Sequence, residues 1–355
     1  DAQFAANAIG RMRFLETLQR YGRAKVLTVA SQTLDYTERM MRAALCRIPD
    51  GTYYGEDFLD DDGVGDEAVA IRVKVTVSRD EVEVDFEGTD PQVGSNLNSP
   101  YAASVSAVLC CFKALLTNAD TPFNQGGERP IRIKIPFGSI LNPRPPAAVR
   151  ARLEACYRAY NAIMMALAPV LPDRVAAPGF DTLTVASLSR LTENGYSVYL
   201  EVFGGGNGAT RFADGCSAVD SPLSNCTNTP IESADRDYDF FRVSHYGLVQ
   251  DSGGPGASRG GLGFAKRFEI LEDGVRLAFY GDRFKRAARG IFGGGDGAIG
   301  RCSILRDGVE TTVWPRSAHL LKKGDIVTMC LGGGGGYGNP EMRPQARVAA
   351  DVRAG

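Results

Sequence analysis

Residues 86–150 read FEGTDPQVGSNLNSPYAASVSAVLCCFKALLTNADTPFNQGGERPIRIKIPFGSILNPRPPAAVR, and this stretch decides the fold. An alternating strand pattern ends near Phe86, and a polar, Gly-rich turn then leads into an apolar helical segment. A second Gly-rich turn leads into another alternating segment at residues 131–135. Two loops rich in Asn, Gly and Asp are therefore expected at strand ends around one buried helix, where binding sites often lie on a rigid scaffold.

The N-terminal 50 residues show helical spacing of apolar residues. The pattern predicts helices over residues 2–21 and 24–47, with Gly22 ending the first. Since neither helix can bury its apolar face alone, we expect them to form a helical hairpin over residues 1–50.

The period changes to two after the turn at Pro49-Asp50-Gly51, which predicts strands between residues 52 and 86. The nearly all-apolar segment 102–116 predicts a buried helix, and residues 150–168 predict another. These elements define an expected mixed unit over residues 51–172, with Asn- and Gly-rich loops at its strand ends.

Beyond residue 173 the sequence predicts short strands separated by glycines. The predicted strands are residues 183–185, 198–202, 268–270, 275–279 and 326–331. The expected fold class is therefore α+β, with a helical N-terminal part and a mixed sheet followed by a β-rich region over residues 173–355 with Gly-rich loops.

Bulk composition excludes several classes of protein. The net charge of −2 comes without a basic stripe, which argues against a nucleic-acid partner, and no apolar run reaches the roughly 20 residues of a membrane span. The eight cysteines contain no C-x-x-C pair, so free thiols and a cytoplasmic location are expected. Only His245 and His319 are present, which argues against a metal site made within this chain.

An acidic run at residues 56–63 superficially resembles a calcium loop. It lacks both the D-x-[DN]-x-[DN]-G spacing and the Glu that closes such a loop. We interpret this run as a solvated hairpin turn.

The Gly-rich segments do not follow the phosphate-loop pattern, because none is followed by Lys and Ser or Thr and none opens a clear helix. Turns and close backbone approach explain the glycines better. Asp251-Ser252-Gly253-Gly254 is similar to the segment around a serine-hydrolase nucleophile, but the preceding residue is Gln250 rather than Gly. A base within reach of Ser252 would have to be one of the two histidines, and the strand-like context of His245 favours a structural role.

A polar set in the strand-end loops is the stronger site prediction. Amide and guanidinium groups bind carbonyl, carboxylate or phosphoryl groups without titrating. Alternatively, the Asn side chains hold turns through the backbone. The candidate substrate-binding residues are Asn96, Asn98, Asn124, Arg129, Asn142, Arg150, Asp251 and Ser252. Nothing in the spacing selects a general base among Glu87, Asp90, Asp214 and Asp282, so the catalytic residues stay unassigned.

The same residues carry a resemblance to the hydantoinase B/oxoprolinase family. GTDPQV, N-x-N-x-P, P-x-N-x-G, RPI and P-x-G-S-x-LNP-x-PPAAV occur in the family's order within residues 86–150. DSGGPG-x-x-RGGLG follows at residues 251–263, GDR at 281–283 and GGGGGYG at 332–338. The resemblance extends from about residue 1 to about residue 351.

The resemblance implies the C-terminal part of the hydrolytic, B-type subunit of an ATP-dependent enzyme. A hydantoinase A-like partner would bind ATP and Mg and phosphorylate a carbonyl oxygen of the small-molecule substrate. Hydantoinases and oxoprolinases then open a cyclic amide with water. The related acetone and acetophenone carboxylases carboxylate a ketone, and the shared motifs do not separate the two reactions. A non-catalytic scaffold subunit is a third alternative.

The resemblance also implies that the metal lies elsewhere. Full-length family members have a further N-terminal region with His and Asp residues associated with a divalent metal. This sequence begins inside the family pattern, so that region is expected to be a separate chain, to be lost, or to lie outside this sequence. No cofactor is then expected on this chain alone, and the metal would belong to that region or to another chain.

Overall fold

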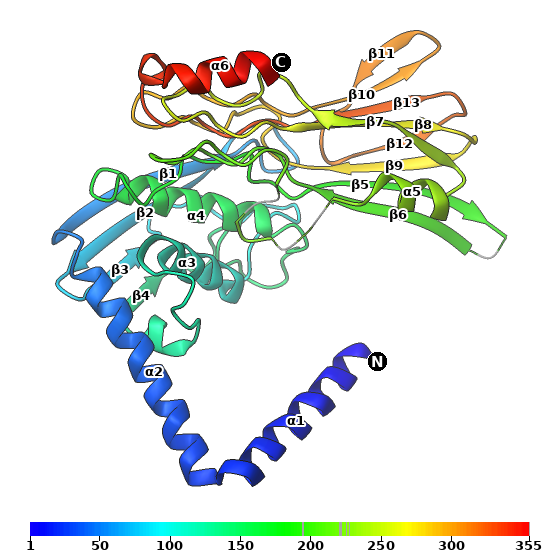
Figure 1. Ribbon diagram of the computed structural model, residues 1–355. Coiled ribbons are helices and arrows are strands. Elements are labelled where there is room, and N and C mark those ends of the chain that lie inside the picture. Colours follow the sequence, from blue (N-terminus) through cyan, green and yellow to red (C-terminus); the bar gives the residue numbers. More distant parts are fainter. Residues whose placement is uncertain (194, 220–221, 225, 227, 355) are drawn as a thin grey trace.

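Three β-sheets organise the part of the chain that the computed structural model describes, residues 1–193, 195–219, 222–224, 226 and 228–354 (Figure 1). One sheet packs with helices, and the other two pack against each other. Two helices project from the body at the N-terminus (Figure 1). This arrangement confirms the predicted α+β class.

The first sheet has the order β1-β2-β3-β4. Its strands are β1 (Gly51–Leu59), β2 (Val69–Ser78), β3 (Glu81–Asp85) and β4 (Ile131–Lys134). β3 and β4 are parallel, so the chain between them crosses over through α3 (Tyr101–Leu116). α4 (Leu153–Leu167) covers β1 and β2 closely, because a Cβ at Gly55 would lie 2.1 Å from the carbonyl oxygen of Ala162.

The helices and strands predicted around this sheet are present, but the N-terminal helices differ from the expected hairpin. α1 (Ala2–Tyr21) and α2 (Arg23–Leu45) diverge from Gly22 instead of lying side by side (Figure 1). Gly22 has φ 82° and ψ 141°, which separates the two helix axes, and α1 has no buried residue. Only the C-terminal half of α2 packs on the body, through Thr37, Met41, Ala44 and Leu45.

The other two sheets form a sandwich. One has the order β11-β10-β13-β8-β7 and the other β12-β9-β5-β6. Their strands are β5 (Thr184–Thr192), β6 (Gly195–Phe203), β7 (Phe241–Leu248), β8 (Phe264–Ile270), β9 (Val275–Tyr280), β10 (Arg301–Arg306), β11 (Val309–Thr312), β12 (Ser317–Leu321) and β13 (Ile326–Cys330). Alternate residues of both sheets, such as Leu188, Leu277, Phe268 and Val327, share one apolar core.

Short helices complete the described chain. They are η1 (Gln125–Glu128), α5 (Ile231–Asp237), η2 (Pro340–Met342) and α6 (Gln345–Ala354). All eight cysteines are free thiols, as predicted. No helix in the described ranges combines the length and apolar character needed to cross a bilayer.

The Gly-rich segments pack backbone against backbone. A Cβ at Gly334 would lie 2.1 Å from the carbonyl oxygen of Asn207, and one at Gly260 would lie 1.9 Å from that of Gly334. Gly254 N donates to Gly334 O at 2.8 Å, and Gly206 N donates to Gly332 O at 3.0 Å. We call these segments, residues 204–208, 253–263, 290–297 and 332–338, the glycine layer. Close approach of backbones is therefore the main reason for these glycines.

Candidate functional site

A cluster of buried charges lies where the first sheet and α4 meet the end of β9. It consists of Asp57, Glu154, Arg158, Asp181, Asp282 and Arg283, each at most 5% exposed. Asp57 comes from β1, Glu154 and Arg158 from α4, and Asp282 and Arg283 from the turn after β9. We call this set the buried charge cluster.

Asp57 is the centre of the cluster. Arg158 Nη1 donates to Asp57 Oδ2 at 3.2 Å, Arg283 Nη2 donates to the same oxygen at 2.8 Å, and Asn161 Nδ2 donates to it at 3.1 Å. Burial alone would raise the pKa of Asp57. The charges of Arg283 and Arg158, together with hydrogen bonds, outweigh burial and lower that pKa to about 2. Asp57 is therefore a permanent anion that ties α4 to the turn after β9.

The pKa of Glu154 is shifted in the opposite direction to that of Asp57. Burial and the charge of Asp282 raise the pKa of Glu154 to about 8, against the effect of Arg158. Its Oε1 accepts hydrogen bonds from Thr182 Oγ1 at 3.0 Å and Leu183 N at 2.9 Å. Its Oε2 has no hydrogen-bond partner among the described residues. Glu154 thus carries a proton at neutral pH in a position closed to solvent.

Asp60 links the cluster to the surface. Its carboxylate accepts backbone hydrogen bonds from Phe284, Lys285 and Arg286 at 2.6, 2.9 and 2.9 Å. Burial and the charge of Asp282 nevertheless raise the pKa of Asp60 to about 6. The carboxylate therefore fixes the turn that follows the GDR motif.

A surface hollow of about 480 Å³ opens beside Asp60. It is lined by Asp60, Asp61, Gly63, Val64, Gly65, Asp66, Phe284, Lys285, Trp314, Pro315 and Arg316. Lys285 Nζ lies 2.8 Å from both Asp61 Oδ2 and Asp66 Oδ1, and Arg316 also pairs with Asp61. Arg316 Nη2 lies 3.6 Å from Asp282 Oδ1, so this side chain connects the hollow to the buried charge cluster. Charges of both signs and one indole are available to a ligand there.

The acidic run leads from β1 into the hairpin connection to β2, as predicted, but the predicted solvation of the run is wrong. Asp57, Asp60 and Asp61 are 2%, 3% and 7% exposed, so three of the five acidic side chains in the run are buried rather than solvated. The reason is long-range pairing, since the partners of Asp57 lie 101 and 226 residues further along the chain. Arg283 of the GDR motif is one of these partners, but no sequence pattern near either segment connects Arg283 with the acidic run.

Four of the predicted site residues lie in one group of loops. Asn98 is fully buried, donates to the carbonyl oxygens of Val93, Ser95 and Ala148, and accepts from Val93 N. Asn142 Nδ2 donates to Ile135 O at 3.1 Å. Asn96 O accepts from the backbone N of Ala151, which follows the exposed Arg150. The two buried or half-buried amides Asn98 and Asn142 hold the loops together through the backbone.

Asn124 and Arg129 belong to a second place, against α2. Asn124 Nδ2 donates to Thr37 Oγ1 at 2.9 Å while its Oδ1 accepts from Gly126 N. Arg129 Nη1 lies 2.8 Å from both Asp35 Oδ1 and Glu38 Oε2. These contacts clamp the C-terminal half of α2 to the body.

Asp251 and Ser252 lie at a third place, next to the glycine layer. Ser252 is buried, donates to Val249 O at 2.7 Å and accepts from Gly263 N at 2.9 Å. Asp251 is exposed and has φ 56°. No hydrogen bond, ion pair or cavity lining joins the three places within the described ranges. A substrate-binding role for these eight residues stays a prediction.

A metal centre would require a group of ligands. In the part of the chain that the structure describes, no three His, Cys, Asp or Glu side chains are arranged to hold a metal ion. In the buried charge cluster, Asp57 is instead engaged by arginines, and Glu154, Asp181 and Asp282 each accept a hydrogen bond from a backbone N–H group.

Comparison with known proteins adds the family. Residues 1–340 match the family model described as Hydantoinase B/oxoprolinase. The chain belongs to this family. It is 33% identical over 369 residues to the B-type subunit of a putative D-/L-hydantoinase from Pseudomonas sp. (strain NS671), and the match covers 100% of this chain and 62% of that protein.

Solved structures of two enzymes share the fold. The crystal structure of ATP-dependent caprolactamase from Pseudomonas jessenii matches with a TM-score of 0.86 and 27% identity, over 100% of this chain and 63% of that one. The nucleotide-free structure of acetone carboxylase matches with a TM-score of 0.83 over 97% of this chain and 53% of that one, but at 17% identity this likeness concerns the fold alone. This member of the hydantoinase B/oxoprolinase family thus spans less than two thirds of the length of these relatives.

Proposed function

We propose that the chain is the C-terminal part of the hydrolytic, B-type subunit of an ATP-dependent amidohydrolase that opens a cyclic amide of the hydantoin or 5-oxoproline type. The observation that carries the proposal is the 33% identity to the B-type subunit of a putative hydantoinase along the whole of this chain. The fold shared with caprolactamase, whose name denotes hydrolysis of a cyclic amide, supports the same reaction class.

A hydantoinase A-like partner subunit supplies ATP, Mg and the phosphorylation step in this proposal. Phosphorylation of the carbonyl oxygen turns a poor electrophile into a reactive intermediate, which a closed site must keep from bulk water. A divalent metal, where the reaction uses one, is held by the N-terminal region of the family pattern or by another chain.

The described residues contribute a rigid support. The buried charge cluster joins α4 to the turn after β9, and that turn, through Lys285, forms one wall of the hollow beside Trp314. Because Glu154 and Asp282 are fully buried, they act on the position of this wall rather than on a substrate.

Phosphate release by the purified complex with its A-like partner tests the proposal. An amidohydrolase releases phosphate from ATP when hydantoin or 5-oxoproline is added alone, and the ring-opened product appears in equal amount. Release that requires acetone and bicarbonate together would assign the complex to the ketone carboxylases. No release with either substrate set, by a folded complex, would favour a scaffold subunit.

The predicted polar residues have their own test in that assay. Arg129→Gln removes the clamp on Asp35 and Glu38, and Arg132→Gln is the matched control, because Arg132 is an exposed arginine paired to Glu81 at 3.3 Å. A substrate-binding role predicts that Arg129→Gln raises KM, whereas Arg132→Gln leaves KM unchanged. Loss of stability with unchanged KM would leave Arg129 a structural residue.

A further inference from the structure

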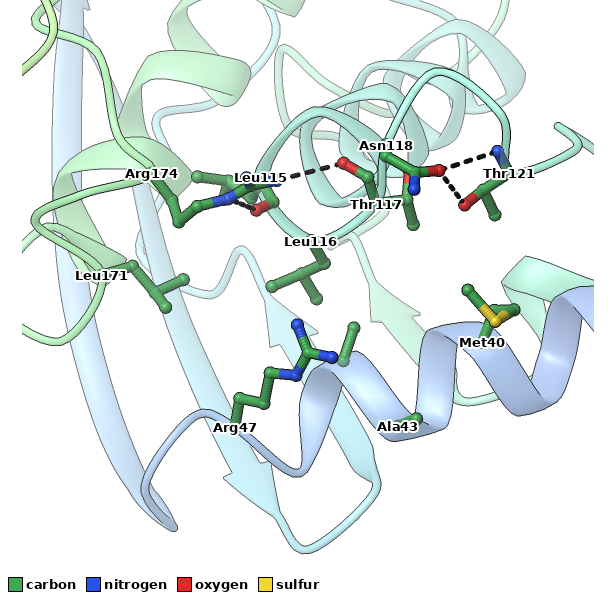
Figure 2. Close-up of a pocket in the computed structure, with 11 residues that line it drawn as sticks. Met40, Ala43, Arg47, Leu115, Leu116, Thr117, Asn118, Thr121, Leu171 and Arg174 are labelled. Carbon is green, nitrogen blue, oxygen red and sulfur yellow. Dashed lines mark hydrogen bonds between the residues drawn. The ribbon is translucent and has the colours of Figure 1, made fainter. Parts of the chain in front are cut away.

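A second cavity lies between α2, the end of α3 and the chain after α4 (Figure 2). Its volume is about 320 Å³, at the small end of the range for ligand pockets. Its lining consists of Met40, Ala43, Ala44, Arg47, Leu115, Leu116, Thr117, Asn118, Thr121, Leu171 and Arg174. We call it the Arg47 groove. Six of these eleven side chains are apolar, so the groove offers an apolar surface with a few polar groups.

The charges in the Arg47 groove have one sign. Its lining contains two arginines and no carboxylate. Arg174 is committed to the fold, because its Nε donates to Leu115 O at 2.7 Å and its Nη2 donates to Thr117 O at 3.0 Å. These bonds occupy carbonyl groups at the C-terminal end of α3 that would otherwise repel an anion.

Arg47 is different. Its guanidinium is exposed and makes no hydrogen bond or ion pair with any described residue. Figure 2 shows the guanidinium rising from the segment after α2 toward Leu116, between the two walls of the groove. The Arg47 guanidinium therefore has hydrogen-bond donors without a described protein partner, in a groove that is also lined by Met40, Leu116 and Leu171.

We propose that the Arg47 groove binds a small carboxylate with an apolar body. The carboxylate pairs with Arg47, for which a bidentate geometry is natural, and the apolar body lies on Ala43, Leu116 and Leu171. A phosphate is a poorer fit, because the groove has one uncommitted guanidinium and few other donors. An amine is disfavoured by the two arginines. This binding site does not depend on the reaction that the complex catalyses.

Ligand-observed NMR on the full chain tests the proposal with defined probes. The probes are butanoate, hexanoate and octanoate, with 1-hexanol and hexylamine as the uncharged and cationic comparisons at the six-carbon length. We expect hexanoate to bind at millimolar concentration, 1-hexanol to bind at least about tenfold more weakly, and hexylamine not to bind. Equal binding of hexylamine and hexanoate, or no binding of any carboxylate, overturns the proposal.

Three variants locate the binding. Arg47→Gln is expected to weaken hexanoate binding about ten- to a hundredfold, which corresponds to the loss of one charge-assisted pair. Ala43→Trp fills the groove from an exposed position on α2 and is expected to abolish binding. Arg39→Gln is the control, because Arg39 is exposed on the same helix but does not line the groove.

Circular dichroism melting of each variant shows whether it is folded. Unchanged hexanoate affinity in folded Arg47→Gln, or an equal loss in Arg39→Gln, contradicts the assignment. Unchanged affinity in folded Ala43→Trp places the ligand outside the groove and also overturns it.

Discussion

The buried charge cluster and the Arg47 groove both depend on arginines, but they use them in opposite ways. Arg158 and Arg283 are 0% and 2% exposed, and both pair with Asp57. Arg47 is exposed and lies beside apolar side chains without a carboxylate in the lining. A buried guanidinium requires a matching anion, so its loss affects folding, whereas an exposed and unmatched one is free to recruit an anion from solution.

The largest loss of unfolding free energy is expected for Arg158→Met. The substitution leaves Asp57 and Asp282 buried with one fewer cation, and breaking a buried pair in this way typically costs about 3–5 kcal/mol. Urea unfolding monitored by circular dichroism measures the change. Failure of the variant to fold agrees with the expectation, while a loss below about 1 kcal/mol would mean that water or rearrangement replaces Arg158.

Glu154→Gln tests the protonated acid of the same cluster. Because the pKa of Glu154 is about 8 in the folded chain, above its ordinary value of 4.5, the folded state binds more protons than the unfolded state between these values. The unfolding free energy contributed by this group therefore falls as the pH rises from about 4.5 to about 8. Gln cannot titrate, so this decline should disappear in the variant.

Unfolding curves of both proteins across that pH range give the comparison. The difference between them isolates Glu154 from other titrating groups, including Asp60. Parallel pH profiles would show that Glu154 ionises normally in the folded protein.

Lys285→Met removes a charge at the rim of the hollow. This side chain is less buried than Arg158 and, unlike Arg47, is paired with carboxylates. Lys285 is 32% exposed and pairs with Asp66, which solvent screens strongly, and with the largely buried Asp61, which Arg316 also neutralises. We expect a loss of at most about 1 kcal/mol, smaller in high salt. Unfolding in low and high salt provides the measurement, and a salt-independent loss would indicate a packing effect of the side chain.

Arg47→Met should change stability least, by about 0.5 kcal/mol or less in either direction, because its exposed guanidinium makes no hydrogen bond or ion pair with any described residue. Thermal and urea unfolding beside Arg158→Met give the contrast directly. A loss of unfolding free energy comparable to that of Arg158→Met would show that Arg47 stabilises the fold as much as an arginine of the buried charge cluster does.

Local sequence patterns predicted the elements well and their long-range partners poorly. The alternation at residues 131–135 and the apolar run at 102–116 identified β4 and α3, because periodicity is a property of neighbouring residues. The predicted solvation of the acidic run was wrong because the arginines that neutralise Asp57 lie far away in the sequence. The predicted packing of α1 against α2 was wrong for a related reason. Apolar spacing identifies the apolar face of a helix but does not identify the surface that covers it.

The candidate site shows the same limit. Asn98 and Asn142 were selected for their amides in strand-end loops, and the alternative that such amides hold turns matches the hydrogen bonds they make. Arg47 was not selected, because nothing in Cys46-Arg47-Ile48 distinguishes it locally. Its position became informative only when α2, α3 and the chain after α4 were brought together in space.

The glycine layer has a consequence for backbone dynamics. Its amides, such as those of Gly254, Gly334 and Gly336, donate to carbonyl groups of other segments in regions without helix or strand. Amide protons held in this way exchange with deuterium only when the layer opens. Protection comparable to that of the central strands should therefore extend through residues 333–336, where a secondary-structure diagram shows only loop.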